Sequence, residues 1–147
     1  MTDRQRRPTE ILSSFGEIAE RYDAIFCDIW GVLHNGVEPY VSSGETLARY
    51  RADGGKVVLV SNAPRPAYTV HDHLREMGVR DDAYDLIVTS GDLARLCLEE
   101  RLAMTVHHIG PPREAPLFAG LDLKFRDVET ADYVICTGFA DDETQTV

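Results

Sequence analysis

The stretch Asp23–Leu33 constrains the fold most, because it joins an apolar run to a carboxylate and a tight turn. The run Ala24–Cys27 ends at Asp28, and Gly31 lies in the turn that follows. This pattern predicts a buried strand over about 24–29. Such a strand delivers Asp28 at its C-terminal end, which is where open α/β sheets bind their ligands.

A second β-branched run, Lys56–Val60, lies further along the chain and ends in Ser61 and Asn62. Two parallel strands lying side by side would place Asp28 and Ser61 in one crevice. We therefore expect these two side chains to form the centre of a site.

The rest of the sequence alternates helical and strand patterns. Helices are predicted over about 9–22, 44–52, 67–77 and 92–102, and further strands over about 56–61, 84–90, 106–109 and 133–137, with a weakly patterned stretch over 111–130. Asp92 is expected to cap the last of these helices. The alternation predicts βαβ units and a mostly parallel sheet, hence an α/β fold with a Rossmann-like three-layer core. Residues 1–8 are predicted to form a disordered polar arm.

The charge and cysteine content narrow the choice of partners. With 147 residues, the chain is long enough for one domain with a core, and its formal net charge of -10 argues against non-specific binding of nucleic acid or an anionic membrane. A phosphorylated substrate stays compatible with this charge, because local N–H groups and a metal can hold phosphate inside an acidic protein.

No segment approaches the roughly 20 apolar residues of a membrane span. Cys27, Cys97 and Cys136 form no CxxC motif, so we expect buried, reduced thiols and a cytoplasmic location.

The segments Asp28–Leu33 and Val57–Asn62 together resemble the paired motifs of the haloacid dehalogenase (HAD) superfamily. The resemblance is closest to the class IIA, NagD-like phosphatases of sugar phosphates, phosphoglycolate and pyridoxal phosphate, and it covers about residues 20–140. The form with Trp in the first motif resembles an uncharacterised subgroup of that class. The resemblance implies a hydrolase, in the first place a magnesium-dependent phosphatase of a small phosphorylated metabolite.

The resemblance also implies roles for individual residues. Asp28 matches the nucleophile that forms an aspartyl-phosphate, and Ser61 matches the hydroxyl that hydrogen-bonds the transferring phosphoryl group. The Asp28 carboxylate and the backbone carbonyl of Trp30 match two oxygen ligands of Mg²⁺. Phosphate or substrate contacts are expected from Trp30, Gly31, Asn62 and Arg65.

Trp30 departs from the family pattern. The phosphatases usually carry Asp at this position, two after the nucleophile, where it protonates the leaving alcohol and later activates water. An indole does neither. The substrate then has a good leaving group, another residue such as His34 supplies the proton, or the site binds without turnover.

The downstream motifs of the family are a second departure. Lys124 is the only lysine after Ser61, and it lies in the weakly patterned stretch. Asp141 and Asp142 follow a strand, but the strand over 133–137 is a better match for the cap of this class. We therefore expect an N-terminal fragment, with residues 9–103 in the HAD-like core and 104–147 at the start of a truncated class II cap. The isolated chain is expected to be inactive or nearly so.

Two other functions remain open at this point. One is a non-catalytic HAD-like protein that binds a phosphorylated ligand, which Trp30 favours. The other is a related enzyme that cleaves a bond other than a phosphate ester. Neither nucleic acid nor a membrane is expected as a partner, and a homo-oligomer is left open.

Overall fold

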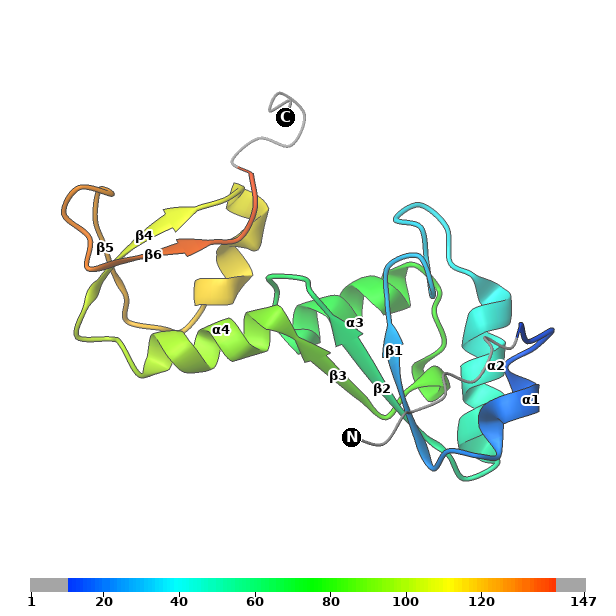
Figure 1. Ribbon diagram of the computed structural model, residues 1–147. Helices are drawn as coiled ribbons and strands as arrows, with labels where there is room; N and C mark the ends of the chain where they lie inside the picture. Colours follow the sequence, from blue (N-terminus) through cyan, green and yellow to red (C-terminus); the bar gives the residue numbers. More distant parts are fainter. Residues whose placement is uncertain (1–10, 140–147) are drawn as a thin grey trace.

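Two small parallel sheets joined by one helix make up the molecule (Figure 1). The computed structural model describes residues 11–139. Its helices and strands are α1 (Gly16–Ala19), β1 (Ala24–Asp28), α2 (Val41–Ala52), β2 (Lys56–Ser61), α3 (Ala67–Glu76), the 3-10 helix η1 (Asp81–Ala83), β3 (Leu86–Thr89), α4 (Ser90–Glu99), β4 (Thr105–Ile109), the 3-10 helix η2 (Pro112–Phe118), β5 (Lys124–Phe125) and β6 (Tyr133–Cys136). The α/β class with parallel strands is confirmed. The polar arm predicted for residues 1–8 and the acidic pair Asp141–Asp142 lie outside the described residues.

The first sheet has the order β1-β2-β3, and all its strands are parallel. In this register Asp28 is opposite Val60 on β2, and Ser61 is opposite Thr89 on β3. Neighbouring strands lie about 4.8 Å apart. The prediction that the strands carrying Asp28 and Ser61 lie side by side and end at one edge is therefore confirmed.

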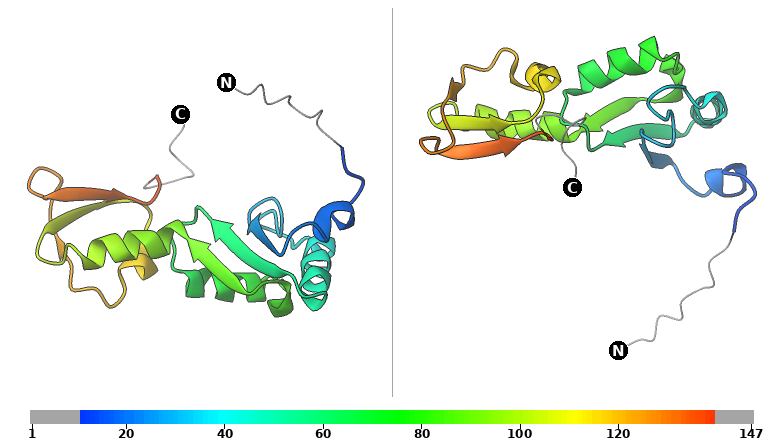
Figure 2. Two further views of the ribbon diagram at one scale, coloured as in Figure 1. Left: turned by 60° about the horizontal axis from the view of Figure 1, so that its bottom comes forward. Right: turned by 90° about the horizontal axis from the view of Figure 1, so that it is seen from above.

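One face of the first sheet carries the core. Val57, Leu59 and Ile87 point to this face and are buried together with apolar residues of α2 and α3. Figure 2 shows α3 along this side of the strands. On the opposite face Phe26 is 80% exposed, and Val60 and Leu86 are exposed as well.

The second sheet has the order β5-β4-β6, and β4 begins at Thr105. Helix α4 leads from the end of β3 into this second sheet (Figure 1). A hydrogen bond from Tyr68 Oη on α3 to the Pro116 carbonyl of η2, at 3.4 Å, joins the two parts. The division into a core over 9–103 and a cap from 104 stays a prediction.

The helix predicted over 9–22 is wrong in its extent, because α1 has only one turn. Ile11 is 94% exposed, so the apolar residues that predicted a long helix do not pack against the core at the N-terminal end of this segment. The Glu17 carboxylate accepts the N–H groups of Ser13 and Ser14 and so fixes the chain just before this turn. Phe15 packs against the core.

Two smaller expectations also need correction. Helix α4 is capped by Thr89, and Asp92 is the third helical residue of a reciprocal capping box with it. Cys97 and Cys136 are exposed and Cys27 is half-buried, all three as free thiols, so the expected burial is wrong for two of them. Helix α4 buries Leu98 and not Cys97, and the side chain of Cys136 leans toward the Gly138 carbonyl.

Asp85 ties the start of β2 to the loop before β3. Its carboxylate accepts hydrogen bonds from Arg51 Nε and Nη2 at 2.9 and 2.8 Å, and from the Val57 N–H at 2.8 Å. The Arg51 hydrogen bond and then the Val57 N–H hold the pKa of Asp85 far below its usual range. The folded state therefore gains stability from the ionised carboxylate.

This arrangement predicts a dependence of stability on acid. Because the folded pKa is depressed, the contribution is full above the unfolded pKa of about 4 and is lost as the pH falls toward the folded pKa. We expect Asp85→Asn to lower the thermal midpoint at pH 7 and to flatten its decline between pH 5 and 2. Thermal unfolding across that range measures this effect. The control is Asp72→Asn, at an exposed position, and a decline equally steep in Asp85→Asn would contradict the assignment.

Candidate functional site

Asp28 is the last residue of β1, and its side chain is exposed at the C-terminal edge of the sheet. Oδ1 accepts the backbone N–H of Ile29 at 2.8 Å, which fixes the carboxylate at the strand end. Among the contacts within 11–139, Oδ2 accepts no hydrogen bond. Asp28 also borders an open hollow of about 560 Å³ along the outer side of β1. One carboxylate oxygen is thus oriented while the other is free to react or to bind a cation.

A larger hollow, of about 920 Å³, opens between α1 and α2 at the other end of β1, where it is lined by Asp23 and Tyr50. It does not reach Asp28. We therefore locate the candidate site at the C-terminal ends of the strands, next to Asp28, and not in the larger hollow.

Ser61 ends β2 at the same edge. Its Oγ accepts the Ala63 N–H at 3.1 Å, which leaves the hydroxyl hydrogen available to a ligand. Asn62 is exposed beside it, and its backbone carbonyl accepts the Ser90 hydroxyl at 2.8 Å. The same hydroxyl lies 2.9 Å from the Ala63 carbonyl.

The start of α4 thereby holds the loop that follows Ser61. In addition to the Ser90 contacts, Asp92 Oδ1 accepts the Ala67 N–H at 3.0 Å, and Gly91 donates its N–H to the Ala63 carbonyl at 3.1 Å. The sequence pattern identified this segment only as a helix cap. Its role in positioning the Ser61 loop has no signal in the sequence, because it depends on β2 and β3 being neighbours.

The turn after Asp28 is closed by its own hydrogen bonds. Gly31 donates to the His34 carbonyl at 2.8 Å, and Val32 donates to the Ile29 carbonyl at 3.2 Å. A phosphate that used the N–H groups around Gly31, as the sequence led us to expect, would have to compete with these acceptors.

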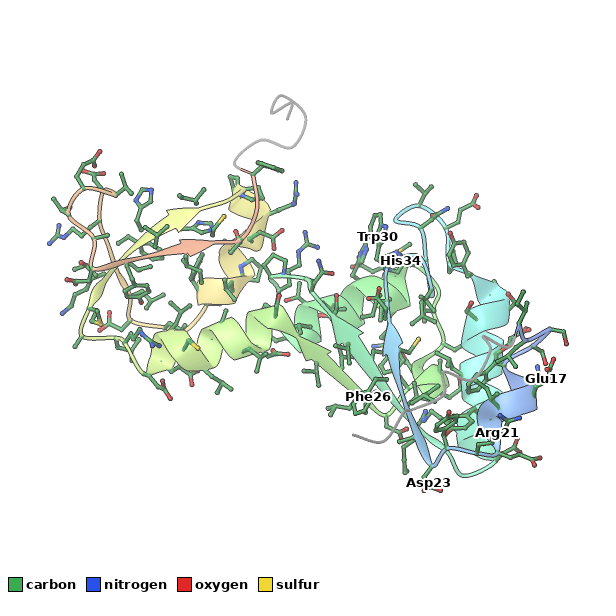
Figure 3. All side chains as sticks on the ribbon, in the orientation of Figure 1. Glu17, Arg21, Asp23, Phe26, Trp30 and His34 are labelled. Carbon is green, nitrogen blue, oxygen red and sulfur yellow. The ribbon has the colours of Figure 1, made fainter. Side chains whose placement is uncertain are left out.

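Trp30 lies on the solvent side of this turn and is 64% exposed, whereas His34 is 4% exposed (Figure 3). Their rings meet edge to face with centroids 5.4 Å apart, and His73 approaches His34 on another side at 5.8 Å. His34 Nδ1 accepts the Gly36 N–H at 3.0 Å. Burial and then the nearby His73 lower the pKa of His34, so this histidine stays neutral at pH 7.

Arg65 contacts the second part of the molecule and not the strand ends. Its Nε and Nη2 donate to both carboxylate oxygens of Glu114 in η2, at 2.9 and 3.0 Å. Glu114 is only 3% exposed, and Arg113 also lies within 3.3 Å of its carboxylate. The predicted substrate contact of Arg65 stays a prediction, and its guanidinium is already engaged. Glu114 was not among the residues predicted for the site, because it lies in the weakly patterned proline-rich stretch.

A divalent cation at this edge would find oxygen ligands of the type that Mg²⁺ prefers. The Asp28 carboxylate provides one of them, and the Trp30 carbonyl, which accepts no backbone hydrogen bond among the described residues, provides the other. Within residues 11–139 no three His, Cys, Asp or Glu side chains gather into a metal-binding group. The two ligands fit a cation that takes its remaining coordination from water and phosphate.

Fold and site together define a class of α/β protein in which a carboxylate and a hydroxyl lie at the carboxyl ends of adjacent parallel strands. The profile of the family described as haloacid dehalogenase-like hydrolase matches residues 25–124. The chain therefore belongs to the haloacid dehalogenase-like hydrolase family, and its fold is similar to that of NagD-like proteins that are 22–23% identical to it. The narrower Trp-containing subgroup stays a prediction.

Three solved structures illustrate this likeness. A haloacid dehalogenase-like hydrolase from Brucella suis is 42% identical with a TM-score of 0.83, over 89% of this chain and 50% of that one. The glycerol phosphate phosphatase of Mycobacterium tuberculosis in complex with magnesium is 28% identical with a TM-score of 0.60, over 83% of this chain and 38% of that one. The 4-nitrophenylphosphatase of Thermotoga maritima is 25% identical with a TM-score of 0.61, over 88% of this chain and 48% of that one.

The chain thus spans half the length of the Brucella hydrolase and less of the other two. No curated protein matches the sequence. In the part of the chain that the structure describes, no helix has the length and apolar character needed to cross a membrane.

Proposed function

We propose that this chain carries the nucleophile of a magnesium-dependent phosphatase that acts on a small phosphorylated metabolite. The observation that carries the proposal is the Asp28 carboxylate, exposed at the end of β1 with one oxygen held by the Ile29 N–H and the other free. Ser61 is the last residue of the neighbouring strand β2, and it directly follows Val60, the residue that pairs with Asp28. The names of the Mycobacterium and Thermotoga neighbours, both phosphatases, support the same chemistry.

Asp28 and the Trp30 carbonyl would hold the metal ion. When bound, Mg²⁺ supplies positive charge that neutralises the phosphate oxygens. The Mycobacterium phosphatase was solved with magnesium and, in a separate structure, with calcium, and hard oxygen ligands suit both cations. Of the two, magnesium is favoured because it keeps several water ligands and needs only one or two carboxylates together with the substrate phosphate.

The chain's own residues account for the transfer step. A carboxylate oxygen of Asp28 forms a bond to phosphorus while the bond from phosphorus to the ester oxygen breaks, and the electron pair leaves with that oxygen. The Ser61 hydroxyl, whose oxygen is already held by the Ala63 N–H, donates to a phosphoryl oxygen. Water then cleaves the acyl phosphate, which releases inorganic phosphate and restores Asp28.

We place the core at residues 9–103 and the start of the cap at 104, with further ligands and substrate contacts supplied in a longer protein such as the relatives it matches. A cytoplasmic location belongs to the same proposal. For the chain by itself we expect the first chemical step, without efficient turnover.

The second candidate is a protein that binds a phosphorylated ligand without hydrolysing it. The position of Trp30 favours it, because the indole offers no proton to a leaving alcohol. An aryl phosphate separates the two candidates, since its phenolate departs without an acid.

The test mixes the chain with phenyl phosphate and Mg²⁺ and measures released phenol by rapid quench, with intact mass to detect a phosphoryl group. The phosphatase proposal expects one phenol per chain, abolished by EDTA, together with the added mass of one phosphoryl group. Calorimetric binding of inorganic phosphate without phenol release or added mass would establish the binding protein instead.

A further inference from the structure

The indole of Trp30 is presented to solvent close to the proposed nucleophile. It follows Asp28 by two residues, yet it is 64% exposed, unlike the buried residues on either side of the turn, Ile29 and Leu33. In Figure 3 Trp30 lies beyond the C-terminal end of β1, while Phe26, the other exposed aromatic residue of this segment, lies lower on the strand. The Trp30 side chain is therefore mostly open to solvent beyond the strand end that carries Asp28.

The ring is also held in place from within the turn. Gly36 has a positive φ of 91°, which favours glycine, and a Cβ built there would overlap the six-membered ring of Trp30, so the turn passes close to the ring. The buried ring of His34 contacts the indole edge to face. A ligand that stacks on the indole thus meets a side chain whose conformation is already restricted, which lowers the entropy cost of binding.

The same turn lacks a proton donor for a leaving group. Among the eight residues that follow Asp28, only His34 has a titratable side chain, and it is buried with Nδ1 engaged by the Gly36 N–H. An alkoxide leaving from phosphorus needs a proton, whereas a phenolate leaves as the anion and takes its proton from water. Both features of the turn favour an aromatic ring next to the phosphoryl group.

We propose that Trp30 determines substrate specificity, and that the substrate is a phosphate monoester whose ester oxygen is carried by an aromatic ring that stacks on the indole. This inference rests on the phosphatase function proposed above. It adds the class of substrate, and it assigns the choice between substrates to the turn that follows the nucleophile Asp28.

The test compares two phosphonates that cannot be hydrolysed and that are similar in size, phenylphosphonate and cyclohexylphosphonate, in the presence of Mg²⁺. Calorimetry gives both dissociation constants. Trp30 is the only tryptophan of the chain, so its fluorescence reports directly on contact with the ring. We expect phenylphosphonate to bind about three- to tenfold more tightly and to change the emission with the same dissociation constant.

Two variants at Trp30 and one matched control test whether the preference for phenylphosphonate depends on the indole. Trp30→Leu should bring the ratio of the two dissociation constants to about one, and Trp30→Phe should keep part of the preference. Phe26→Leu, which removes the exposed aromatic ring lower on β1, should leave the ratio unchanged. Thermal unfolding checks that each variant is folded, and since the Trp30 side chain is exposed, we expect midpoints close to the parent.

The outcomes separate this inference from the function on which it rests. Binding of inorganic phosphate and of both phosphonates with equal affinity would overturn the aromatic specificity and leave the phosphatase proposal standing. Loss of the preference in Phe26→Leu but not in Trp30→Leu would also overturn it. No binding of phosphate or of either phosphonate would remove the anion site and both proposals with it.

Discussion

Asp28→Asn is expected to abolish the phenol burst from phenyl phosphate, with phosphoryl transfer slowed by about 10⁴-fold or more, as when other enzymes lose their nucleophile. The amide is a poor nucleophile, but its carbonyl can still accept the Ile29 N–H that now fixes Oδ1. The geometry of the strand end is thereby kept while the reactive oxygen is lost. Rapid-quench phenol release and intact mass measure the effect.

The matched control is Asp23→Asn, which makes the same change just before the other end of β1 (Figure 3). We expect it to leave the burst intact. Thermal unfolding of both variants should remain close to that of the parent chain, because both side chains are exposed. A burst that persists in Asp28→Asn would show that another group accepts the phosphoryl.

Gly91→Ala is expected to destabilise the fold by about 3 kcal/mol, since overpacking at a site that cannot relax costs this much. A Cβ at Gly91 would overlap the backbone N, C and O atoms of Arg65, and backbone has little freedom to move away. The Gly91 N–H also donates to the Ala63 carbonyl, so displacing α4 would break a second contact. For a chain of this length the thermal midpoint should fall by roughly 9 °C.

Gly44→Ala is the control with the opposite sign. Gly44 lies within α2, and a Cβ there would have nothing within 4 Å. Alanine should therefore stabilise the helix by about 0.5–1 kcal/mol, because it reduces the freedom of the unfolded chain. If Gly91→Ala were as stable as the parent, the close approach of α4 to the Ser61 loop would be incorrect.

The strands were predictable because their signal is local. The runs before Asp28 and Ser61 are short and mostly apolar, the second run is rich in valine, and the structure places β2 at the predicted residues, Lys56–Ser61. The helix over 9–22 failed for the opposite reason. Its apolar spacing predicts a helix only if a surface covers the stripe, and at Ile11 there is none.

The same distinction between local signals and contacts made only in the folded chain applies to the candidate site. Asp28 and Ser61 could be placed from sequence, because parallel strands end at one edge of a sheet whatever the details of packing. The contacts of Ser90 with the Ser61 loop, and of Arg65 with Glu114, join segments far apart in the chain. No local pattern encodes such pairs, so they appear only once the fold is known.

The order of the strands also bears on how the chain folds. In the first sheet every pair of neighbouring strands is consecutive in the sequence, and the second sheet is built entirely from residues from Thr105 onward. Each sheet is therefore complete within one continuous stretch of the chain. During synthesis from the N-terminus, β1, β2 and β3 are all available before β4 has been made. The first sheet, with Asp28 and Ser61 at its edge, can thus form as a separate folding unit before the second sheet exists.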